Sequence, residues 1–259
     1  MYTRDDIIKQ LNAIGPPRDR VVIMHSAYSK VGNIYGGPEA FLDIMVEYFT
    51  VHGGLFCIPT HTWDLVDRTD VTLDLGKKYT NLGLLPRLAL DREDGIRSEN
   101  PTHSLVVFGE RERALRFIEN ETRVETPTSP KGCYGKLYSE GGSVLLVGVD
   151  HSANTYLHAV DEMLGIPRLE SYPRKLAVRY ADGREDKRDI YMFDESEGDF
   201  SHYFNKYYDC FCEAGAQRSG KIGDADALLC DAASIKDTLE QIYRRYEGKD
   251  PLKESRLIL

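Results

Sequence analysis

The amino-acid sequence predicts an α/β fold in which a single mixed sheet, with a parallel strand–helix–strand core and a later β-hairpin, is flanked by helices. Short runs rich in β-branched residues alternate with segments whose apolar residues recur at helical spacing. The first such unit comprises VVIMHS (21–26), a helix-spaced stretch over residues 38–49, and LFCIPT (55–60). Further along, Asp182-Gly183 separates two alternating runs, which is the sequence signature of a hairpin turn.

The first third of the chain carries the clearest signals. Thr3 precedes acidic residues and an apolar pattern at helical spacing, so a helix is expected to begin there and to end at Gly15. The runs at 21–26 and 55–60 are short, apolar and bounded by turn residues, as buried parallel strands are. Pro38 suits the first turn of a helix between them, which completes the strand–helix–strand unit.

The rest of the chain continues this alternation without a repeat, a low-complexity tract or a linker. Further strands are expected over residues 104–109 and 143–149, and further helices over residues 82–90, 111–118, 200–212 and 232–246. The hairpin occupies residues 175–195 and makes the sheet mixed. A chain of 259 residues is about the size of one large α/β domain, and we expect residues 1–259 to form a single domain.

The composition excludes several classes of protein. Lys and Arg number 33 against 42 Asp and Glu, whereas a protein that tracks nucleic-acid phosphates needs a basic surface. The acidity is compatible with a cationic small-molecule partner, but more often it simply serves solubility. The five cysteines form neither a disulfide framework nor a zinc motif, and no stretch approaches the roughly twenty apolar residues of a membrane span. Because the N-terminus lacks a signal sequence, we expect a soluble, cytoplasmic protein without nucleic-acid or membrane partners.

Three loops at predicted strand ends are the places to look for a site, because open α/β sheets bind ligands at the carboxyl ends of their strands. HSAYSKVGNIYGG (25–37) joins hydroxyl residues to glycines ahead of a helix, and this composition is suited to binding phosphate or carbonyl oxygens. The loop contains no Walker or dinucleotide-binding motif, so an ordinary tight turn is the alternative. In residues 94–104, Arg97 is placed to grip a phosphate or to bind a nearby carboxylate.

The third loop, residues 150–162, carries a possible acid–base pair. If a helix begins near Asn154, His158 and Asp161 lie three positions apart on one face, where a carboxylate can orient the imidazole. Such pairs are also common on solvated helices, so the spacing alone leaves both interpretations open. The chain contains no G-x-S-x-G elbow and no H-E-x-x-H motif, and its histidines are scattered, so neither a serine hydrolase nor a metal site is expected.

Five ordered blocks that span nearly the whole chain resemble the aminoglycoside 3-N-acetyltransferases, a family distinct from the GNAT-type acetyltransferases. The blocks are HSAYSKVGNIYGG (25–37), CIPTHTWD (57–64), GIRSENPTHSLVVFGERERAL (95–115), residues 126–168, and GKIGDADALLCDAASI (220–235). The resemblance implies one acetyltransferase domain in which acetyl-CoA lies along a cleft. Its acetyl group then passes directly to a substrate amine, without a covalent enzyme intermediate and without a metal.

The resemblance also implies catalytic roles. In the family a threonine leads into a histidine that is followed three positions later by a glutamate, and the matching positions here are Thr155, His158 and Asp161. His158 is then the expected general base, since a histidine can take a proton from an ammonium near neutral pH. Asp161, or its neighbour Glu162, is expected to orient the imidazole. Thr155 or Ser26 is the expected donor to the thioester carbonyl.

The family's binding residues carry over in the same way. The implied contacts to acetyl-CoA are Ser26, Tyr28, Ser29, Val31, Gly36 and Gly37, with Arg97, Ser98, Thr102 and Ser104 nearby and Lys131 at a phosphate. Family members hold polycationic aminosugars through acidic side chains, and the candidates are Asp64, Glu162, Asp194, Glu195, Glu197 and Asp199. A homodimer is compatible with this class of enzyme.

The leading hypothesis for function is acetylation of the 3-amino group of an aminoglycoside, which confers antibiotic resistance. A relative that acetylates another small amine in secondary-metabolite biosynthesis would share the acetyl-CoA half of the site. A non-catalytic CoA-binding relative is the third alternative, and the aspartate at position 161 is the feature that suggests it.

Overall fold

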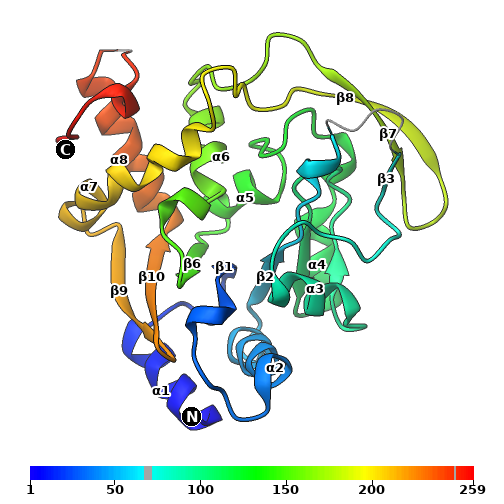
Figure 1. The fold of residues 1–259 in the computed structure, drawn as a ribbon, viewed down its shortest axis with the longest axis vertical. Coiled ribbons are helices and arrows are strands. Elements are labelled where there is room, and N and C mark those ends of the chain that lie inside the picture. Colours follow the sequence, from blue (N-terminus) through cyan, green and yellow to red (C-terminus); the bar gives the residue numbers. More distant parts are fainter. Residues whose placement is uncertain (67–71, 248) are drawn as a thin grey trace.

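A seven-stranded mixed sheet forms the centre of the molecule in a computed structural model, which describes residues 1–66, 72–247 and 249–259 (Figure 1). The strand order is β4-β5-β2-β1-β6-β10-β9. The strands are β1 (Val21–Ser26), β2 (Leu55–Pro59), β4 (Ile96–Arg97), β5 (Leu105–Phe108), β6 (Ser143–Val147), β9 (Gln217–Ile222) and β10 (Ala225–Asp231). The central strands β2, β1 and β6 are parallel, and the outer strands on both sides are antiparallel.

Helices cover both faces of this sheet. They are α1 (Arg4–Ile14), α2 (Gly37–Thr50), α3 (Leu84–Asp91), α4 (Arg111–Ile118), α5 (Cys133–Ser139), α6 (Tyr156–Met163), α7 (Tyr208–Glu213) and α8 (Ala232–Arg245). Short 3-10 segments are η1 (Tyr28–Lys30), η2 (Trp63–Leu65), η3 (Glu121–Arg123), η4 (His151–Ala153), η5 (Phe200–Tyr207) and η6 (Pro251–Lys253). As predicted, α1 begins after Thr3, which forms a capping box with Asp6, and ends at Gly15 with a φ of 71°.

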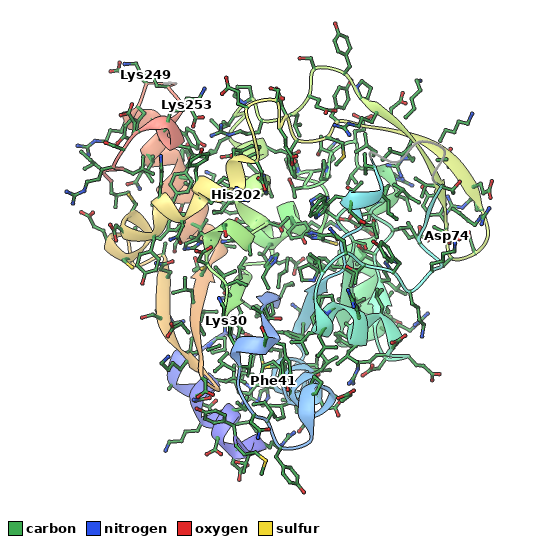
Figure 2. All side chains as sticks on the ribbon, viewed as in Figure 1. Lys30, Phe41, Asp74, His202, Lys249 and Lys253 are labelled. Carbon is green, nitrogen blue, oxygen red and sulfur yellow. The ribbon has the colours of Figure 1, made fainter. Side chains whose placement is uncertain are left out.

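The alternation of side chains along β1 divides the core into two layers. Val21 and Ile23 face a cluster that α4, α5, α6, α7 and α8 cover. Val22 and Met24 face the opposite cluster, which α1, α2 and α3 cover. Side chains fill the space between the elements, with Phe41 of α2 buried in the second layer and Lys249 at the periphery (Figure 2).

A second, three-stranded sheet contains the predicted hairpin, so the expectation of a single sheet was wrong. The hairpin strands β7 (Arg174–Arg179) and β8 (Glu185–Ile190) pair with each other and with β3 (Thr72–Asp74), not with the central sheet. The physical reason lies in β8, whose sequence EDKRDI buries only its final residue and cannot occupy the interior of a sheet covered on both faces. This second sheet has its own small apolar cluster, which includes Leu176 and Val178.

Most other predicted elements are confirmed, with two differences. The parallel unit β1-α2-β2 and the helices α3, α4 and α8 lie where the sequence placed them. The helix expected over residues 200–212 is a 3-10 segment, η5, that continues into α7. The hairpin β9-β10 was not predicted, because the edge strand QRSGKI is polar and contains a glycine. Within the described residues, no helix is long and apolar enough to cross a membrane.

Candidate active site

A cavity of about 460 Å³ lies at the carboxyl ends of the central parallel strands. β1 delivers His25 and Ser26 to it, and the segment after β2 delivers His61. The connection after β6 passes through η4 into α6, which contributes Thr155 and His158. The carboxyl ends of parallel strands thus supply one wall, as is usual for sites in α/β folds.

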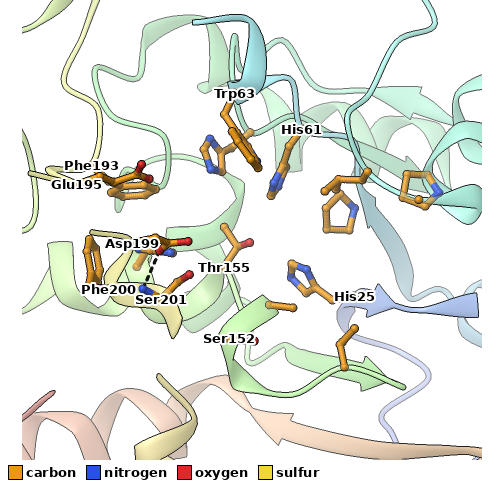
Figure 3. Close-up of a pocket in the computed structure, with 18 of the residues that line it drawn as sticks. His25, His61, Trp63, Ser152, Thr155, Phe193, Glu195, Asp199, Phe200 and Ser201 are labelled. Carbon is orange, nitrogen blue, oxygen red and sulfur yellow. Dashed lines mark hydrogen bonds between the residues drawn. The ribbon is translucent and has the colours of Figure 1, made fainter. Parts of the chain in front are cut away.

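Another part of the cavity lining is aromatic. Phe193 comes from the segment that follows β8, and Phe200 from the start of η5. Trp63 of η2 is about half exposed at the same cavity (Figure 3). Arg174 of the second sheet also lines the cavity. Residues far apart in the sequence therefore meet around one space, and the second sheet positions part of it.

His158 sits in an aromatic cage on the cavity wall. Its ring stacks on Phe193 with centroids 4.1 Å apart and contacts Phe200 and Phe204 edge to face at 5.0 Å and 4.9 Å. Among the described residues, no group forms a hydrogen bond with its buried Nδ1 atom. Burial, with smaller effects from His103 and Arg168, holds the pKa of His158 well below its ordinary value. The ring is therefore neutral near pH 7 and able to accept a proton.

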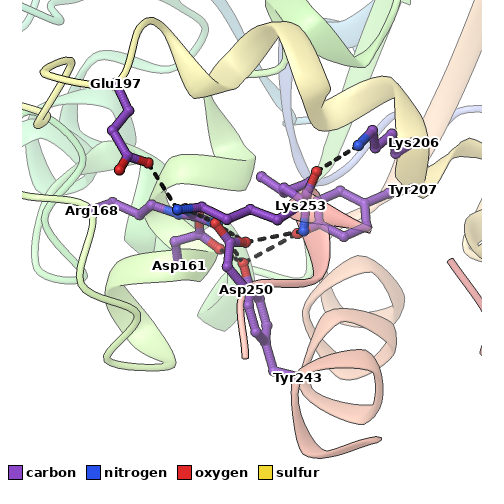
Figure 4. A network of polar contacts seen from close by, with 9 residues as sticks. Asp161, Arg168, Glu197, Lys206, Tyr207, Tyr243, Asp250 and Lys253 are labelled. Carbon is purple, nitrogen blue, oxygen red and sulfur yellow. Dashed lines mark hydrogen bonds and ion pairs between the residues drawn. The ribbon is translucent and has the colours of Figure 1, made fainter. Parts of the chain in front are cut away.

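The structure places Asp161 in a different network from His158, which corrects the expectation that it orients the imidazole. Its buried carboxylate accepts hydrogen bonds from Tyr243 Oη at 2.9 Å and from Arg168 Nε at 3.2 Å (Figure 4). Arg168 in turn donates two hydrogen bonds of 2.7 Å to Asp250. A guanidinium with five donors attracts the carboxylate more strongly than the neutral imidazole does. Burial still raises the pKa of Asp161 to about 6.

Glu162 does not take over the orienting role. Its carboxylate accepts hydrogen bonds from Thr126 Oγ1 and Thr128 Oγ1, both at 2.5 Å. Glu162 is therefore used to hold the loop that precedes α5, and it does not line the cavity. Helix α6 carries no carboxylate that contacts His158 in the described part of the chain.

Three further histidines line the cavity, and sequence reasoning did not single them out. The rings of His61 and His103 lie 4.4 Å apart, His61 Nε2 is 2.7 Å from Tyr134 Oη, and His103 Nδ1 is 3.0 Å from Thr102 Oγ1. Burial lowers the pKa of His25 to about 3 and that of His103 to about 3. The described residues contain no group of three or more His, Cys, Asp and Glu suited to a metal ion.

Arg97 does not line the cavity, and its predicted contact with a phosphate stays a prediction. The guanidinium donates to the carbonyl oxygens of Lys77 at 2.8 Å, Leu75 at 3.2 Å and Tyr79 at 3.2 Å, and to Ser104 Oγ at 3.1 Å. Burial lowers its pKa to about 10. Arg97 therefore clamps residues 75–79 to the central sheet.

The other cofactor residues expected in this region are also buried. Ser98, Thr102 and Ser104 are at most 1% exposed and do not line the cavity. Ser98 Oγ accepts from the Leu105 amide at 3.0 Å, and Ser104 Oγ donates to the Thr60 carbonyl at 2.8 Å. Their hydroxyls stabilise the loop before β5 and are not accessible to a ligand.

The cofactor residues predicted at the end of β1 and in the loop after it differ in their position relative to the cavity. Ser26 lines the cavity. Tyr28 instead packs against Phe41, with ring centroids 5.6 Å apart, and Val31 is fully buried. The expected contact of Val31 with the cofactor stays a prediction. Ser29, Gly36, Gly37 and Lys131 lie outside the cavity lining, and the two glycines have positive φ values of 82° and 75° at the start of α2.

The predicted acidic residues divide into two groups. Glu195 and Asp199 line the cavity. Asp64 accepts a hydrogen bond from Tyr79 Oη at 2.7 Å, Asp194 accepts one from the Ser196 amide at 3.0 Å, and Glu197 pairs with Lys253 at 2.8 Å, all outside the cavity lining. The carboxylates that face the cavity come from the loop between β8 and η5.

Some of the cavity-lining residues that were not predicted have a recognisable signal in the sequence, and others have none. His25 lies at the end of β1 and His61 lies two residues after β2, within the blocks that carry the family resemblance, so the rule about strand ends could have found them. Phe193 and Phe200 lie more than thirty positions after His158, and no local pattern indicates that their rings enclose it. Their role depends on how the second sheet and η5 pack on α6.

Known proteins with similar sequences are acetyltransferases. The chain is 26% identical to aminoglycoside N(3)-acetyltransferase VII of Streptomyces paromomycinus, over 91% of this chain and 89% of that protein. It is 22% identical to the aminoglycoside N(3')-acetyltransferase-like protein YokD of Bacillus subtilis, over 96% of this chain and 94% of that protein.

Solved structures share the fold. The complex of AAC-IIIb with CoASH has a TM-score of 0.78 and 24% identity, over 96% of this chain and 99% of that chain. A mutant of the aminoglycoside acetyltransferase AAC(3)-IVa in complex with a gentamicin has a TM-score of 0.79 and 23% identity, over 96% of this chain and 92% of that chain. The family model described as aminoglycoside 3-N-acetyltransferase matches residues 23–244. The protein therefore belongs to the aminoglycoside 3-N-acetyltransferase family and is an acetyltransferase of this type.

Proposed function

We propose that the protein transfers the acetyl group of acetyl-CoA directly to a substrate amine, with His158 as the general base. The observation that carries this proposal is an imidazole that lines the cavity and that burial keeps neutral near pH 7. A base must reach the proton that it removes, and His158 presents its ring to a cavity large enough for reacting groups.

The chemistry follows from the cage around His158. An ammonium has no lone pair with which to attack a thioester, so the acceptor first loses one proton to solvent and reacts as the neutral amine. His158 accepts a second proton from the nitrogen as the lone pair forms its bond to the acetyl carbon. The carbon–sulfur bond then breaks, and the proton held by His158 passes to the leaving thiolate. Phe193, Phe200 and Phe204 disfavour a lasting imidazolium because they exclude water from it. The aromatic cage therefore favours release of the proton to the product.

Acetyl-CoA is the proposed acyl donor, and a structurally similar acetyltransferase has been solved with CoASH bound. Ser26 at the end of β1 is a proposed contact for the donor, because it lines the cavity. Tyr28, Ser29, Gly36, Gly37 and Lys131 are proposed contacts for the rest of CoA outside the cavity. The backbone at Gly36 and Gly37, at the N-terminus of α2, is suited to phosphate oxygens.

The 3-amino group of an aminoglycoside is the proposed acceptor. The relatives from Streptomyces and Salmonella are named as aminoglycoside N(3)-acetyltransferases, and Glu195 and Asp199 supply negative charge at the cavity for a cationic ligand. Another small amine is a second candidate. It is favoured by the aromatic part of the cavity lining, which Trp63, Phe193 and Phe200 form.

A panel of amines tests these proposals together. The protein is incubated with acetyl-CoA and either aminoglycosides or aromatic and aliphatic monoamines, while thiol release is followed. Turnover of aminoglycosides at the 3-amino group supports the first acceptor, and turnover of monoamines alone supports the second. If CoA binds but no amine is acetylated, the protein is a CoA-binding relative and the proposed catalysis is wrong.

A further inference from the structure

His25 is a buried polar residue that none of the roles above explains. Its side chain is 8% exposed, and among the described residues no group forms a hydrogen bond with its Nε2 atom. A buried donor or acceptor that lacks a partner destabilises the folded protein, so such an atom calls for an explanation. Because His25 also lines the cavity, a bound ligand is the partner that the site can supply.

The position of His25 on β1 directs its ring toward helix α6. Successive side chains of a strand alternate between faces, and Val21 and Ile23 lie in the layer covered by α5, α6 and α8. His25 continues this series. Figure 3 shows its ring extending from the end of β1 into the space that Thr155 reaches from α6.

We propose that His25 donates a hydrogen bond from Nε2 to the carbonyl oxygen of the acetyl thioester and stabilises the negative charge that develops there. This inference rests on the proposed acetyl transfer and assigns a catalytic role to a residue outside the expected set. His25 and His158 reach the same cavity from β1 and from α6. The acetyl carbon thus lies between His158, which accepts the proton of the amine, and His25, which donates a hydrogen bond to the carbonyl oxygen.

The chemical state of His25 suits a donor. Burial lowers its pKa to about 3, so the ring stays neutral throughout the physiological range. A neutral imidazole can carry its proton on Nε2 and polarise a carbonyl without first giving that proton away, as a neutral histidine does in triosephosphate isomerase. No proton moves to or from His25 in the step. Attack of the amine places charge on the oxygen, and collapse of the tetrahedral intermediate with loss of the thiolate removes that charge again.

The competing assignment is a contact with the amides of the pantetheine arm, which CoA and acetyl-CoA share. The two assignments differ in a measurable way, because a donor to the acetyl oxygen acts mainly on the transition state, whereas a donor to pantetheine contributes equally to the binding of both forms. The variant His25→Ala removes the ring, and His25→Asn keeps a neutral N–H donor. His52→Ala is the matched control, since His52 is exposed in the turn after α2.

The first measurement is the single-turnover rate of acetyl transfer, together with the affinities for CoA and acetyl-CoA. We expect His25→Ala to lower the rate by about 10²- to 10³-fold, the typical effect of losing one such donor, with the affinity for CoA unchanged. His25→Asn is expected to recover part of the rate, and His52→Ala to match the wild type. An unchanged rate in His25→Ala, or equal losses of affinity for CoA and acetyl-CoA, overturns the assignment.

The second measurement does not require turnover. The infrared stretching frequency of ¹³C-labelled acetyl-CoA reports the hydrogen bond to its carbonyl in the complex. We expect a lower frequency in the wild type and in His52→Ala than in His25→Ala, and an intermediate value in His25→Asn. If no amine is acetylated but this difference holds, the proposed transfer fails while the contact to the carbonyl stands. If the frequency is the same in all variants, the inference fails, whatever the turnover.

Discussion

The ring of Phe193 stacks on the imidazole of His158, with centroids 4.1 Å apart and planes 19° apart. Phe193 thus takes the place beside the base where a carboxylate was expected. A carboxylate would raise the pKa of the imidazole, whereas an aromatic neighbour excludes water and lowers it. His158, the proposed base, is therefore held by packing and not by a charged partner.

Replacement of Phe193 by Ala is expected to move the acid limb of the pH profile. In the wild type His158 stays neutral well below pH 6.5, so kcat/KM should hold its plateau as the pH falls through that value. In Phe193→Ala water reaches the ring, the pKa of His158 rises toward 6.5, and activity declines at higher pH than in the wild type. Phe49→Ala, which removes a buried ring from the opposite layer of the core, should leave the acid limb in place. If the pH profiles of the wild type, Phe193→Ala and Phe49→Ala coincide, the aromatic cage does not lower the pKa of His158.

The Arg168 network is expected to stabilise the fold around α6. Arg168→Met leaves the carboxylate of Asp161, which is 1% exposed, without its cation, and should cost about 3 to 5 kcal/mol in the free energy of unfolding. Asp161→Asn should cost only about 1 kcal/mol, because Arg168 keeps Asp250. Lys253→Met, which breaks an exposed pair, is the control and should cost less than about 1 kcal/mol.

The pH dependence of stability gives this second prediction a further test. The pKa of Asp161 is about 6 in the folded state, above its ordinary value of 3.8, so the folded protein binds more protons between these values. The contribution of Asp161 to stability therefore falls as the pH rises from 3.8 to 6. Without Arg168 that pKa rises further, and the defect of Arg168→Met should grow with pH in urea titrations. If the loss of stability in Arg168→Met becomes smaller as the pH rises, Arg168 does not stabilise the charged carboxylate of Asp161.

Arg97 and Lys131 are expected to separate structure from cofactor binding. Arg97→Met removes the clamp on residues 75–79 and should cost about 3 kcal/mol, or roughly 6 to 12 °C in Tm, while the folded protein keeps its affinity for CoA. Lys131→Ala should leave Tm unchanged and weaken CoA binding, since Lys131 is exposed. Melting curves and calorimetric titration measure both effects. A normal Tm together with a lost affinity for CoA in Arg97→Met would indicate that Arg97 contacts a phosphate of CoA.

Asp199 is expected to favour polycationic acceptors. Asp199→Asn removes a negative charge from the cavity, while the new amide can still cap η5 at the Ser201 amide. We expect KM for an aminoglycoside to rise by about two- to fivefold, with KM for a monoamine less affected. Asp194→Asn is the control, because Asp194 lies on the same loop outside the cavity lining. Equal effects of the two substitutions would exclude a specific role for Asp199.

Periodicity and turn chemistry predicted the parts of the fold in which neighbouring residues decide the structure. The unit β1-α2-β2 and the capping box at Thr3 were recognisable because each depends on a few adjacent positions. The second sheet was not, since the pairing of β3 with β7 joins segments about a hundred residues apart. A hairpin signal shows that two strands pair, but it does not show which sheet they join.

The site shows the same division. The family resemblance placed His158, Thr155 and Ser26, and all three line the cavity. Helical spacing alone could not predict the partner of Asp161, because that partner, Arg168, lies beyond the end of α6. The structural role of Arg97 could not be predicted, because backbone carbonyls of residues 75–79 converge on it and carbonyl oxygens leave no signal in a sequence.

The central claim is that His158 removes the proton from the attacking amine. Its most direct test is the single-turnover rate of acetyl transfer in His158→Ala, with the affinity for acetyl-CoA measured on the same samples. The structure predicts a rate lower by about 10²- to 10⁴-fold with acetyl-CoA still bound, and partial recovery when imidazole is added. A wild-type rate in this variant would show that another group is the base.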